Sequence, residues 1–381
     1  MTYLLINPYP FERRNGVTSY LRNLLEFLHR RGIEVVCMSN DDRLPWRRYQ
    51  ERVRDMVTTR FRPDAAFIEA PEVGSPTLLL PPEYRVHIRL HCPTALVQRH
   101  NGRSVNLEQF GDELRVIRAA HVVSSPSHAL LTELAPHLDV SPIHVYKNPP
   151  PGGVASSNPR RKEHDVVFMG NFTRAKGADF LNPLLTRLPP RYSVLLVGRY
   201  SDGFEVSPGV HCSVTVRDHI AGPERLRLLA ETRVVLMLSR FENCSMLVLE
   251  CLRVGTIVAG WEVGGHAEIA GPSLIRLVPL GDLDALASVV VTSVEGVYPS
   301  RDAFRAATGL VMEDFRRGWS RVWATGRGRA PEGIYHGLDC RLSKPPEDST
   351  SPRPAPALPR GDGLSLRAET PAHHAVRGGD R

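Results

Sequence analysis

The sequence VVLMLSRFENCSMLVLE, residues 234–250, determines the fold class expected for this chain. Its apolar first part is typical of a parallel strand covered on both faces, so the residues after Leu238 should lie at the strand's carboxyl end. Ligands bind at that edge in open α/β sheets. Ser245 can cap a following helix whose free amides attract phosphate, and Glu242 and Glu250 can accept hydrogen bonds from sugar hydroxyls. The stretch therefore predicts a ligand that combines sugar and phosphate.

Length and composition indicate a globular cytoplasmic protein. The 381 residues can form two domains of ordinary size, and 42% apolar residues can fill two cores. The six scattered cysteines form no CxxC pair, which argues against a zinc site or a disulfide framework. The sequence contains neither a basic leader nor 18 consecutive apolar residues, so we expect no secretion signal and no membrane span. The net charge of +7 without a basic run favours an anionic ligand or a membrane surface over nucleic acid.

Strands alternate with helices along most of the chain, which predicts an α/β protein with two Rossmann-like, doubly wound domains facing a central cleft. The first domain is expected at residues 1–148. Residues 149–163 are rich in turn formers and predict a linker, and residues 164–300 predict the second domain. A helix at residues 301–325 could cross back to the first domain. Residues 326–381 are expected to be a disordered tail, to which no role is assigned.

Three glycine-bearing loops are expected to face the cleft. The first contains Gly16, where a ligand could approach the backbone, although a plain turn is an equally good interpretation. The second, GNFTRAKG at residues 170–177, carries Arg174 and Lys176 at a helix start. Cations oppose the helix dipole there, so a bound diphosphate is a better explanation than two solvated side chains. The third, residues 261–271, supports a ligand site only in combination with the others. None of these loops has the GxGxxG or Walker A pattern.

Two further motifs concern catalysis and metal binding. His91 ends a strand of the first domain, where it could reach a sugar hydroxyl or a leaving phosphate, although a lone histidine is more often structural. The Asp282-Leu283-Asp284 sequence has the DxD form of metal-dependent sugar transferases. It precedes an apolar helix, so a helix cap is the better interpretation. We expect no metal and no other cofactor.

Six segments in order resemble a GT-B fold glycosyltransferase, specifically glycosyltransferase family 4, whose retaining enzymes use nucleotide sugars. They are NGVTSYLRNLLEFLHRRGIEVV, AHVVSSPSHALLTEL, VYKNPP, VVFMGNFTRAKG, FENCSMLVLECLRVGTIVAG and VGGHAEI, and the likeness as a whole runs from about residue 3 to residue 294. The fifth contains a Glu-x7-Glu signature. One such pair is weak evidence, but six segments on the expected elements are specific.

The resemblance implies that residues 1–148 form the acceptor-side domain and residues 164–300 the nucleotide-sugar-binding domain. It also implies roles for individual residues. Glu250 would hold the nucleotide ribose, and Glu242 would lie beside the transferred sugar. His91 resembles the cleft histidine near that sugar, Gly16 the glycine of the first-domain loop, and Lys176 the lysine that meets the phosphates. The backbone amides of the turn would meet the sugar and diphosphate; these belong to Asn243, Cys244, Ser245 and Met246.

The sequence departs from the family pattern at three places. Asn171 stands where many members have an arginine in the phosphate loop, so Arg174 could substitute for it in donor binding. Asn15-Gly16 replaces a double glycine. Asn243-Cys244-Ser245 replaces a more glycine-rich turn, which could narrow the choice of sugar.

The resemblance implies transfer of a hexosyl unit, with retention, from a UDP- or GDP-sugar to an acceptor hydroxyl. The product would be a glycan, a glycolipid or a glycosylated metabolite. The alternative is a catalytically silent protein of the same fold that binds a nucleotide sugar or a glycan. Nucleotide release from a panel of donor sugars separates the two.

Residues 43–62 bear on the acceptor. They contain seven arginines, and their apolar residues recur at roughly helical spacing. Such a helix could rest on anionic lipid at the inner membrane face and bring the cleft to a lipid-linked acceptor. The favoured alternative is a helix that packs on the sheet and exposes a solvated basic face.

Overall fold

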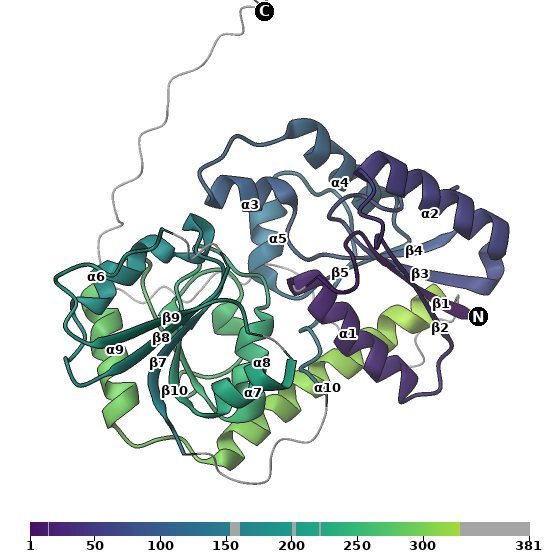
Figure 1. The fold of residues 1–381 in the computed structure, drawn as a ribbon. Coiled ribbons are helices and arrows are strands. Elements are labelled where there is room, and N and C mark those ends of the chain that lie inside the picture. The colour runs from purple at the N-terminus through teal and green to yellow at the C-terminus, as the bar shows by residue number, and fades with distance from the viewer. Residues whose placement is uncertain (14, 153–160, 200–202, 221, 328–381) are drawn as a thin grey trace, which may run out of the picture. The chain divides into compact units, whose positions relative to one another are not determined.

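The computed structural model describes residues 1–327 except residues 14, 153–160, 200–202 and 221 (Figure 1). The predicted tail from residue 328 onward and most of the predicted linker therefore lie outside the described residues. All the elements below belong to one compact unit.

The first half of the chain forms a parallel sheet in the order β2-β1-β3-β4-β5-β6. Its strands are β1 (Thr2–Asn7), β2 (Val35–Ser39), β3 (Ala66–Pro71), β4 (Arg85–Arg89), β5 (Val122–Ser125) and β6 (Ile143–Val145). Its helices are α1 (Gly16–His29), α2 (Trp46–Arg60), α3 (Thr94–His100), α4 (Leu107–Ala119) and α5 (His128–Leu134). Within β1, Leu4 pairs with Val36 of β2 and Ile68 of β3.

The second half also forms a six-stranded parallel sheet, but in a different strand order, β12-β11-β10-β7-β8-β9. Its strands are β7 (His164–Met169), β8 (Ser193–Val197), β9 (Ser213–Arg217), β10 (Thr232–Met237), β11 (Ile257–Trp261) and β12 (Ile275–Val278). Its helices are α6 (Leu181–Leu185), α7 (Gly222–Ala230), α8 (Met246–Val254), α9 (Leu283–Glu295) and α10 (Arg301–Gly326). The predicted fold class is confirmed.

Alternation along the strands assigns each sheet face to a different set of helices. In β1, Leu4 and Ile6 pack in one cluster with residues of α2 and α4, whereas Tyr3 and Leu5 pack in another with residues of α1 and α10. The second sheet has the same arrangement, with α6 and α9 against one face and α7 and α8 against the other. The cluster that contains α1, α8 and α10 includes side chains from both sheets, so the two halves share part of their core.

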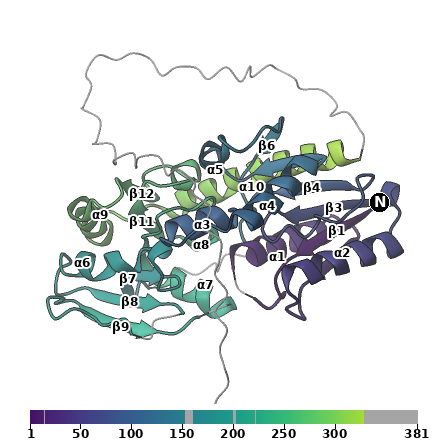
Figure 2. The same cartoon turned by 90° about the horizontal axis from the view of Figure 1, so that it is seen from above.

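Helix α10 contacts both halves of the chain (Figure 2). Its first part packs against α8 through Phe304 and Val311, and its last part lies on β4, β5 and β6. Gly318 allows a close approach, because a Cβ atom there would lie 2.1 Å from the Tyr146 ring. The helix was predicted to end at residue 325, but it continues to Gly326, so the predicted tail begins too early.

Helix α2 covers the basic stretch discussed above. Tyr49, Val53 and Val57 are buried in the core, so these apolar side chains are not available to a membrane. Five of its region's seven arginines form ion pairs, namely Arg43–Glu12, Arg48–Glu51, Arg52–Asp42, Arg54–Asp55 and Arg62–Asp64. Three of these carboxylates, Glu12, Asp42 and Asp64, lie outside residues 43–62. The sequence of the segment therefore overstates the net positive charge of this part of the surface. None of the described helices is long and apolar enough to span a bilayer.

Other differences concern element lengths. The helix predicted at residues 177–188 is a short 3₁₀ turn followed by α6 (Leu181–Leu185). Strand β12 (Ile275–Val278) was missed, because its sequence IRLV is short and only two of its four residues are buried. The predicted cap at Asp282 is confirmed, since its carboxylate accepts a hydrogen bond from the amide of Ala285 at 2.9 Å.

Candidate functional site

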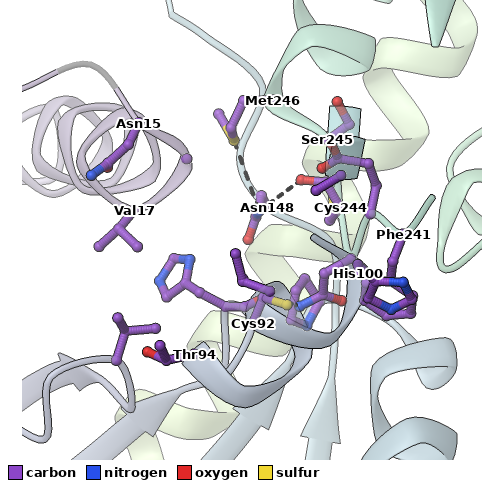
Figure 3. A pocket seen from close by; sticks show the side chains of 18 of the residues that line it. Asn15, Val17, Cys92, Thr94, His100, Asn148, Phe241, Cys244, Ser245 and Met246 are labelled. Atoms are coloured by element: carbon purple, nitrogen blue, oxygen red, sulfur yellow. Dashed lines mark hydrogen bonds between the residues drawn. The ribbon is translucent and has the colours of Figure 1, made fainter. Parts of the chain in front are cut away.

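A cavity of about 420 Å³ lies where strand ends of the two sheets approach each other (Figure 3). Its lining on the N-terminal half comprises Tyr9, Arg13, Asn15, Gly16, Val17, Trp46, Val73, His91, Cys92, Thr94, Val97, His100, Pro126 and Asn148. Its lining on the C-terminal half comprises Ala175, Lys176, Phe241, Glu242, Asn243, Cys244, Ser245 and Met246. The cavity brings together eight of the predicted residues: Gly16, His91, Lys176, Glu242, Asn243, Cys244, Ser245 and Met246.

Glu242 carries the negative charge of the C-terminal wall. It follows β10, and its Oε1 accepts a hydrogen bond from the Ser239 hydroxyl at 2.8 Å and pairs with Lys176. Burial opposes ionisation of this carboxyl, but Lys176 and His266 together hold the pKa of Glu242 below its usual value. The wall therefore presents an ionised carboxylate beside an ammonium group.

Two glycines allow the backbone to pack closely around Glu242. Gly177 has φ +74°, and a Cβ atom there would lie 1.9 Å from the carbonyl oxygen of Leu238. Gly264 has φ +54°, and a Cβ atom there would lie 2.0 Å from the carbonyl oxygen of Glu242. That carbonyl also accepts a hydrogen bond from the amide of Gly265 at 2.8 Å. The second and third glycine loops thus support the Glu242 loop from two sides.

The loop after Glu242 is connected to the N-terminal half. The side-chain amide of Asn243 donates to the carbonyl oxygen of His91 at 2.6 Å, and its oxygen accepts from Ser127. Ser245 occupies the N-cap position of α8, but its side chain makes no capping hydrogen bond. The expected side-chain cap is therefore absent, and the first amides of α8 keep their capacity to bind an anion.

The imidazole of His91 is neutral in this cavity. Burial, with a smaller contribution from Arg89, lowers the pKa of His91 to about 3. Its ring packs edge-on against Tyr20, with the centroids 5.0 Å apart. His91 can therefore exchange hydrogen bonds with a ligand but carries no positive charge near neutral pH.

Two buried glutamates hold the loop of residues 91–94 from beneath. The Glu72 carboxylate accepts from the His91 amide at 3.0 and 2.9 Å, and Glu113 accepts from the Thr94 amide at 2.9 Å and hydroxyl at 2.6 Å. Burial and then the charge of Glu113 raise the pKa of Glu72 to about 8. Burial raises the pKa of Glu113 to about 7. Both carboxyls are used as a scaffold and resist ionisation.

Asn148 links the two walls. Its side-chain oxygen accepts from the buried Arg89 at 2.9 Å, and its amide donates to the Cys244 carbonyl oxygen at 3.3 Å (Figure 3). The sequence placed Asn148 within the VYKNPP segment without assigning it a role. Its position shortly after β6, at the domain crossing, was the available signal.

Three predicted residues lie outside the cavity lining. Glu250 is on α8 and forms an ion pair with Arg225 of α7, with the Nε to Oε2 distance 2.7 Å. Burial raises the pKa of Glu250, and Arg225 opposes that rise. Asn171 and Arg174 are in the second glycine loop, where the Arg174 carbonyl accepts from Arg240. Sequence reasoning missed Arg225, because nothing in a single sequence pairs α7 with α8.

No group of three or more His, Cys, Asp or Glu side chains within the described residues is placed to hold a metal ion.

Comparisons with known proteins agree with this architecture. Residues 163–295 match the family described as "Glycosyl transferases group 1". No protein with a curated description matches the sequence significantly.

Three solved structures illustrate the shared fold. AviGT4, a glycosyltransferase involved in avilamycin A biosynthesis, is 18% identical, with a TM-score of 0.62 over 85% of this chain and 98% of that chain. Sucrose-phosphate synthase from Thermosynechococcus elongatus is 15% identical, with a TM-score of 0.66 over 85% of this chain and 100% of that chain. Anabaena HepE in complex with UDP is 16% identical, with a TM-score of 0.63 over 85% of this chain and 99% of that chain. The chain therefore has the GT-B fold of glycosyltransferases, and its residues 163–295 match the group 1 glycosyl transferases.

Proposed function

We propose that the chain transfers a hexosyl unit from a UDP- or GDP-sugar to an acceptor hydroxyl with retention of the anomeric configuration. The observation that carries this proposal is the Glu242–Lys176 pair at the end of β10, beside the uncapped start of α8. Anabaena HepE, which shares the fold, has been crystallised with UDP and with UDP-glucose, which supports a nucleotide-sugar donor here.

Charge complementarity explains how these residues would act. As the bond between the sugar and the diphosphate breaks, its electron pair goes to the departing diphosphate, which gains negative charge. Lys176 and the first amides of α8 are the groups that stabilise this charge, and removing such a group from an enzyme costs about 10²–10³ in rate. Glu242 accepts hydrogen bonds from hydroxyls of the transferred sugar, and Glu250 those of the ribose.

Retention requires attack from the face that the diphosphate leaves. In this scheme the acceptor oxygen bonds to the anomeric carbon on that face, and the acceptor proton passes to an oxygen of the leaving diphosphate. Glu242 is bound to Lys176 and Ser239, so same-face attack assisted by the phosphate is favoured over a covalent intermediate on this carboxylate. The neutral imidazole of His91 is suited to hold a sugar hydroxyl but not to stabilise the diphosphate by charge.

A donor panel tests the proposal. UDP-, GDP- and ADP-sugars are incubated with the protein and a cell extract as acceptor source, and nucleotide release is measured. Transfer should occur with UDP- or GDP-sugars and be lost in Glu242→Ala, by at least about 10³-fold. Glu83→Ala, at an exposed position far from the cavity lining, is the control and should keep full activity. Nucleotide binding without release would instead support a catalytically silent binding protein.

A lipid-linked acceptor would be reached through contact between α2 and an anionic membrane. The ion pairs of the arginines in residues 43–62 reduce the positive charge available for that contact. Flotation with anionic vesicles tests the membrane contact directly, and recovery of the protein in the lower fraction would exclude it.

A further inference from the structure

The two walls of the cavity differ in chemistry. On the C-terminal wall, Lys176 and Glu242 present opposite charges. On the N-terminal wall, several polar side chains are already engaged within the protein. The Asn15 side chain caps α1 by accepting from the Thr18 amide at 2.8 Å, and the Thr94 hydroxyl donates to Glu113. Asn148 is bound by Arg89 and bonds to the Cys244 carbonyl, as described above.

Apolar side chains make up much of the N-terminal wall. They are Tyr9, Val17, Trp46, Val73 and Val97. Trp46 is 39% exposed and Val97 is 44% exposed, although both are large and apolar. Exposed apolar surface that lines a cavity, rather than standing singly on the outside, indicates a binding surface.

The Trp46 ring is held in one orientation. It lies against the backbone at Gly74, where a Cβ atom would be 2.1 Å from the ring, and Gly74 has φ +76°. The Tyr9 ring meets it edge-on, with centroids 6.4 Å apart and an interplanar angle of 87°. The guanidinium of Arg13 lies over the Tyr9 ring, 4.6 Å from its centroid. Trp46 and Tyr9 thus form a fixed aromatic corner at the cavity, which we call the Trp46 corner.

We propose that the acceptor carries an apolar ring that packs against the Trp46 corner and Val97. This inference rests on the proposed transferase function and names the class of acceptor. A polyhydroxylated glycan chain packed on this aromatic surface would lose hydrogen bonds to water, and the Asn15, Thr94 and Asn148 side chains, which are already engaged, could not replace them. An apolar ring loses none, and it gains contact with an aromatic surface that is already fixed in place.

Arg13, His91 and His100 are further polar residues of this wall. The face of the Arg13 guanidinium lies over the Tyr9 ring and its N–H groups stay available to a polar group of the acceptor, so the proposed preference concerns the Trp46 corner and Val97 alone. The His100 ring stacks on Phe241, with ring centroids 5.3 Å apart and an interplanar angle of 13°, and its Nε2 atom is buried without a hydrogen-bond partner among the described residues. His91 lies at the junction with the C-terminal wall, where the proposed reaction assigns it to the transferred sugar.

Three probes that share one glucosyl unit isolate the contribution of the ring. They are phenyl β-D-glucoside, methyl β-D-glucoside and cellobiose, which differ only in the group attached to the anomeric oxygen. Affinity is measured by calorimetric titration, with and without saturating UDP. We expect the phenyl glucoside to bind at least about tenfold more tightly than either other probe. Equal affinities, or tighter binding of cellobiose, would overturn the proposal.

Variants assign the preference to the proposed surface. Trp46→Ala should remove most of the phenyl preference, and Val97→Ser should reduce it about threefold. Leu107→Ala is the matched control, because Leu107 is 76% exposed but does not line the cavity, and it should keep the full preference. An unchanged preference in both Trp46→Ala and Val97→Ser would contradict the proposal even if the phenyl glucoside binds best. Val97 keeps the test valid should Trp46→Ala fail to fold.

The titrations separate this inference from the proposed function. If neither UDP nor GDP binds and no donor is turned over, the transferase proposal fails. The ring preference measured without nucleotide then still decides whether the Trp46 corner binds apolar rings. If donors are turned over but the phenyl preference is absent, only the acceptor class is wrong.

Discussion

The cavity lies between two loops that are held by glutamates in opposite ways. The loop of residues 239–245 carries Glu242 toward the cavity, where Lys176 keeps the pKa of this carboxyl low. The loop of residues 91–94 is held from beneath by Glu72 and Glu113, which bind its backbone and have raised pKa values. All three carboxyls are strongly buried, so the presence or absence of a cation decides which one stays ionised. The charged loop is suited to the reaction, and the neutral loop is suited to fixing geometry.

After Glu242→Ala, the largest effect is expected from removing the cation of the first loop. Lys176→Met should lower kcat/KM about 10²–10³-fold, because it removes both a diphosphate contact and the partner of Glu242. The pKa of Glu242 should rise, so residual activity should appear only at higher pH than in the unchanged protein. Lys176→Arg, which keeps the charge, is the control for this pH profile. A profile that does not move in Lys176→Met would mean that Lys176 does not set the ionisation of Glu242.

The raised pKa of Glu72, which holds the loop of residues 91–94, should make the free energy of unfolding depend on pH. The pKa of Glu72 is raised from 4.5 to about 8 by folding, so the folded protein retains a proton that the unfolded chain releases. Stability should therefore fall as pH rises from about 5 to 8. Glu72→Gln cannot ionise, so its free energy of unfolding should decline less over this range, by about 2–4 kcal/mol. Urea unfolding at pH 5, 6, 7 and 8 measures the difference, and parallel pH curves for the two proteins would be the contrary result.

Asn148 joins the two loops, so its removal should affect both stability and activity. Asn148→Ala leaves the buried Arg89 without one acceptor and frees the Cys244 carbonyl. We expect a loss of about 1–3 kcal/mol in stability and about tenfold in kcat/KM. Asn23→Ala is the matched control, because Asn23 bonds to the adjacent Pro149 carbonyl at 3.0 Å but does not line the cavity. Equal activities of the two variants would show that the link between the loops is unimportant for transfer.

The smallest effect is expected at a paired glutamate outside the cavity lining. Arg225→Ala removes the partner of Glu250, and the KM for the nucleotide sugar should rise about threefold, since partly exposed ion pairs contribute little. Arg227→Ala, on the same helix and paired with Glu231, should leave KM unchanged. Steady-state kinetics with the best donor measures both. A tenfold or larger rise in the KM of Arg225→Ala would contradict this expectation and would show that the Arg225–Glu250 pair matters as much for the reaction as Asn148.

The sequence predicted the parts of the site that depend on chain order. A buried strand followed by a helix start placed Glu242 to Met246 at a sheet edge, because parallel strands end at a common edge and ligands bind there. The same reasoning brought Lys176 and Gly177 to the neighbouring strand end. The predicted side-chain cap at Ser245 was wrong. Ser245 occupies the N-cap position, but this position alone does not ensure that the side chain bonds to the free amides.

The residues that sequence reasoning missed act through contacts between distant segments. Glu72 and His91 are close because β3 and β4 are neighbours, and Glu113 reaches Thr94 from α4. Trp46 belongs to the basic segment of residues 43–62, which the sequence predicts either to rest on anionic lipid or to pack on the sheet. In the structure, Trp46 lines the cavity. Three arginines of that segment are paired with carboxylates that precede or follow it.

The sequence by itself determined the two parallel sheets, the edge that carries the site and the identity of its charged residues, because strand and helix periodicity and loop position are local properties of the chain. Only the tertiary structure decided which carboxyls are ionised and where apolar side chains gather in the cavity. Burial and the distance to a cation set the pKa of each glutamate, and both depend on segments brought together by folding. Whether Trp46 faces a core, a membrane or a ligand likewise depends on its neighbours in space and not on its neighbours in the chain.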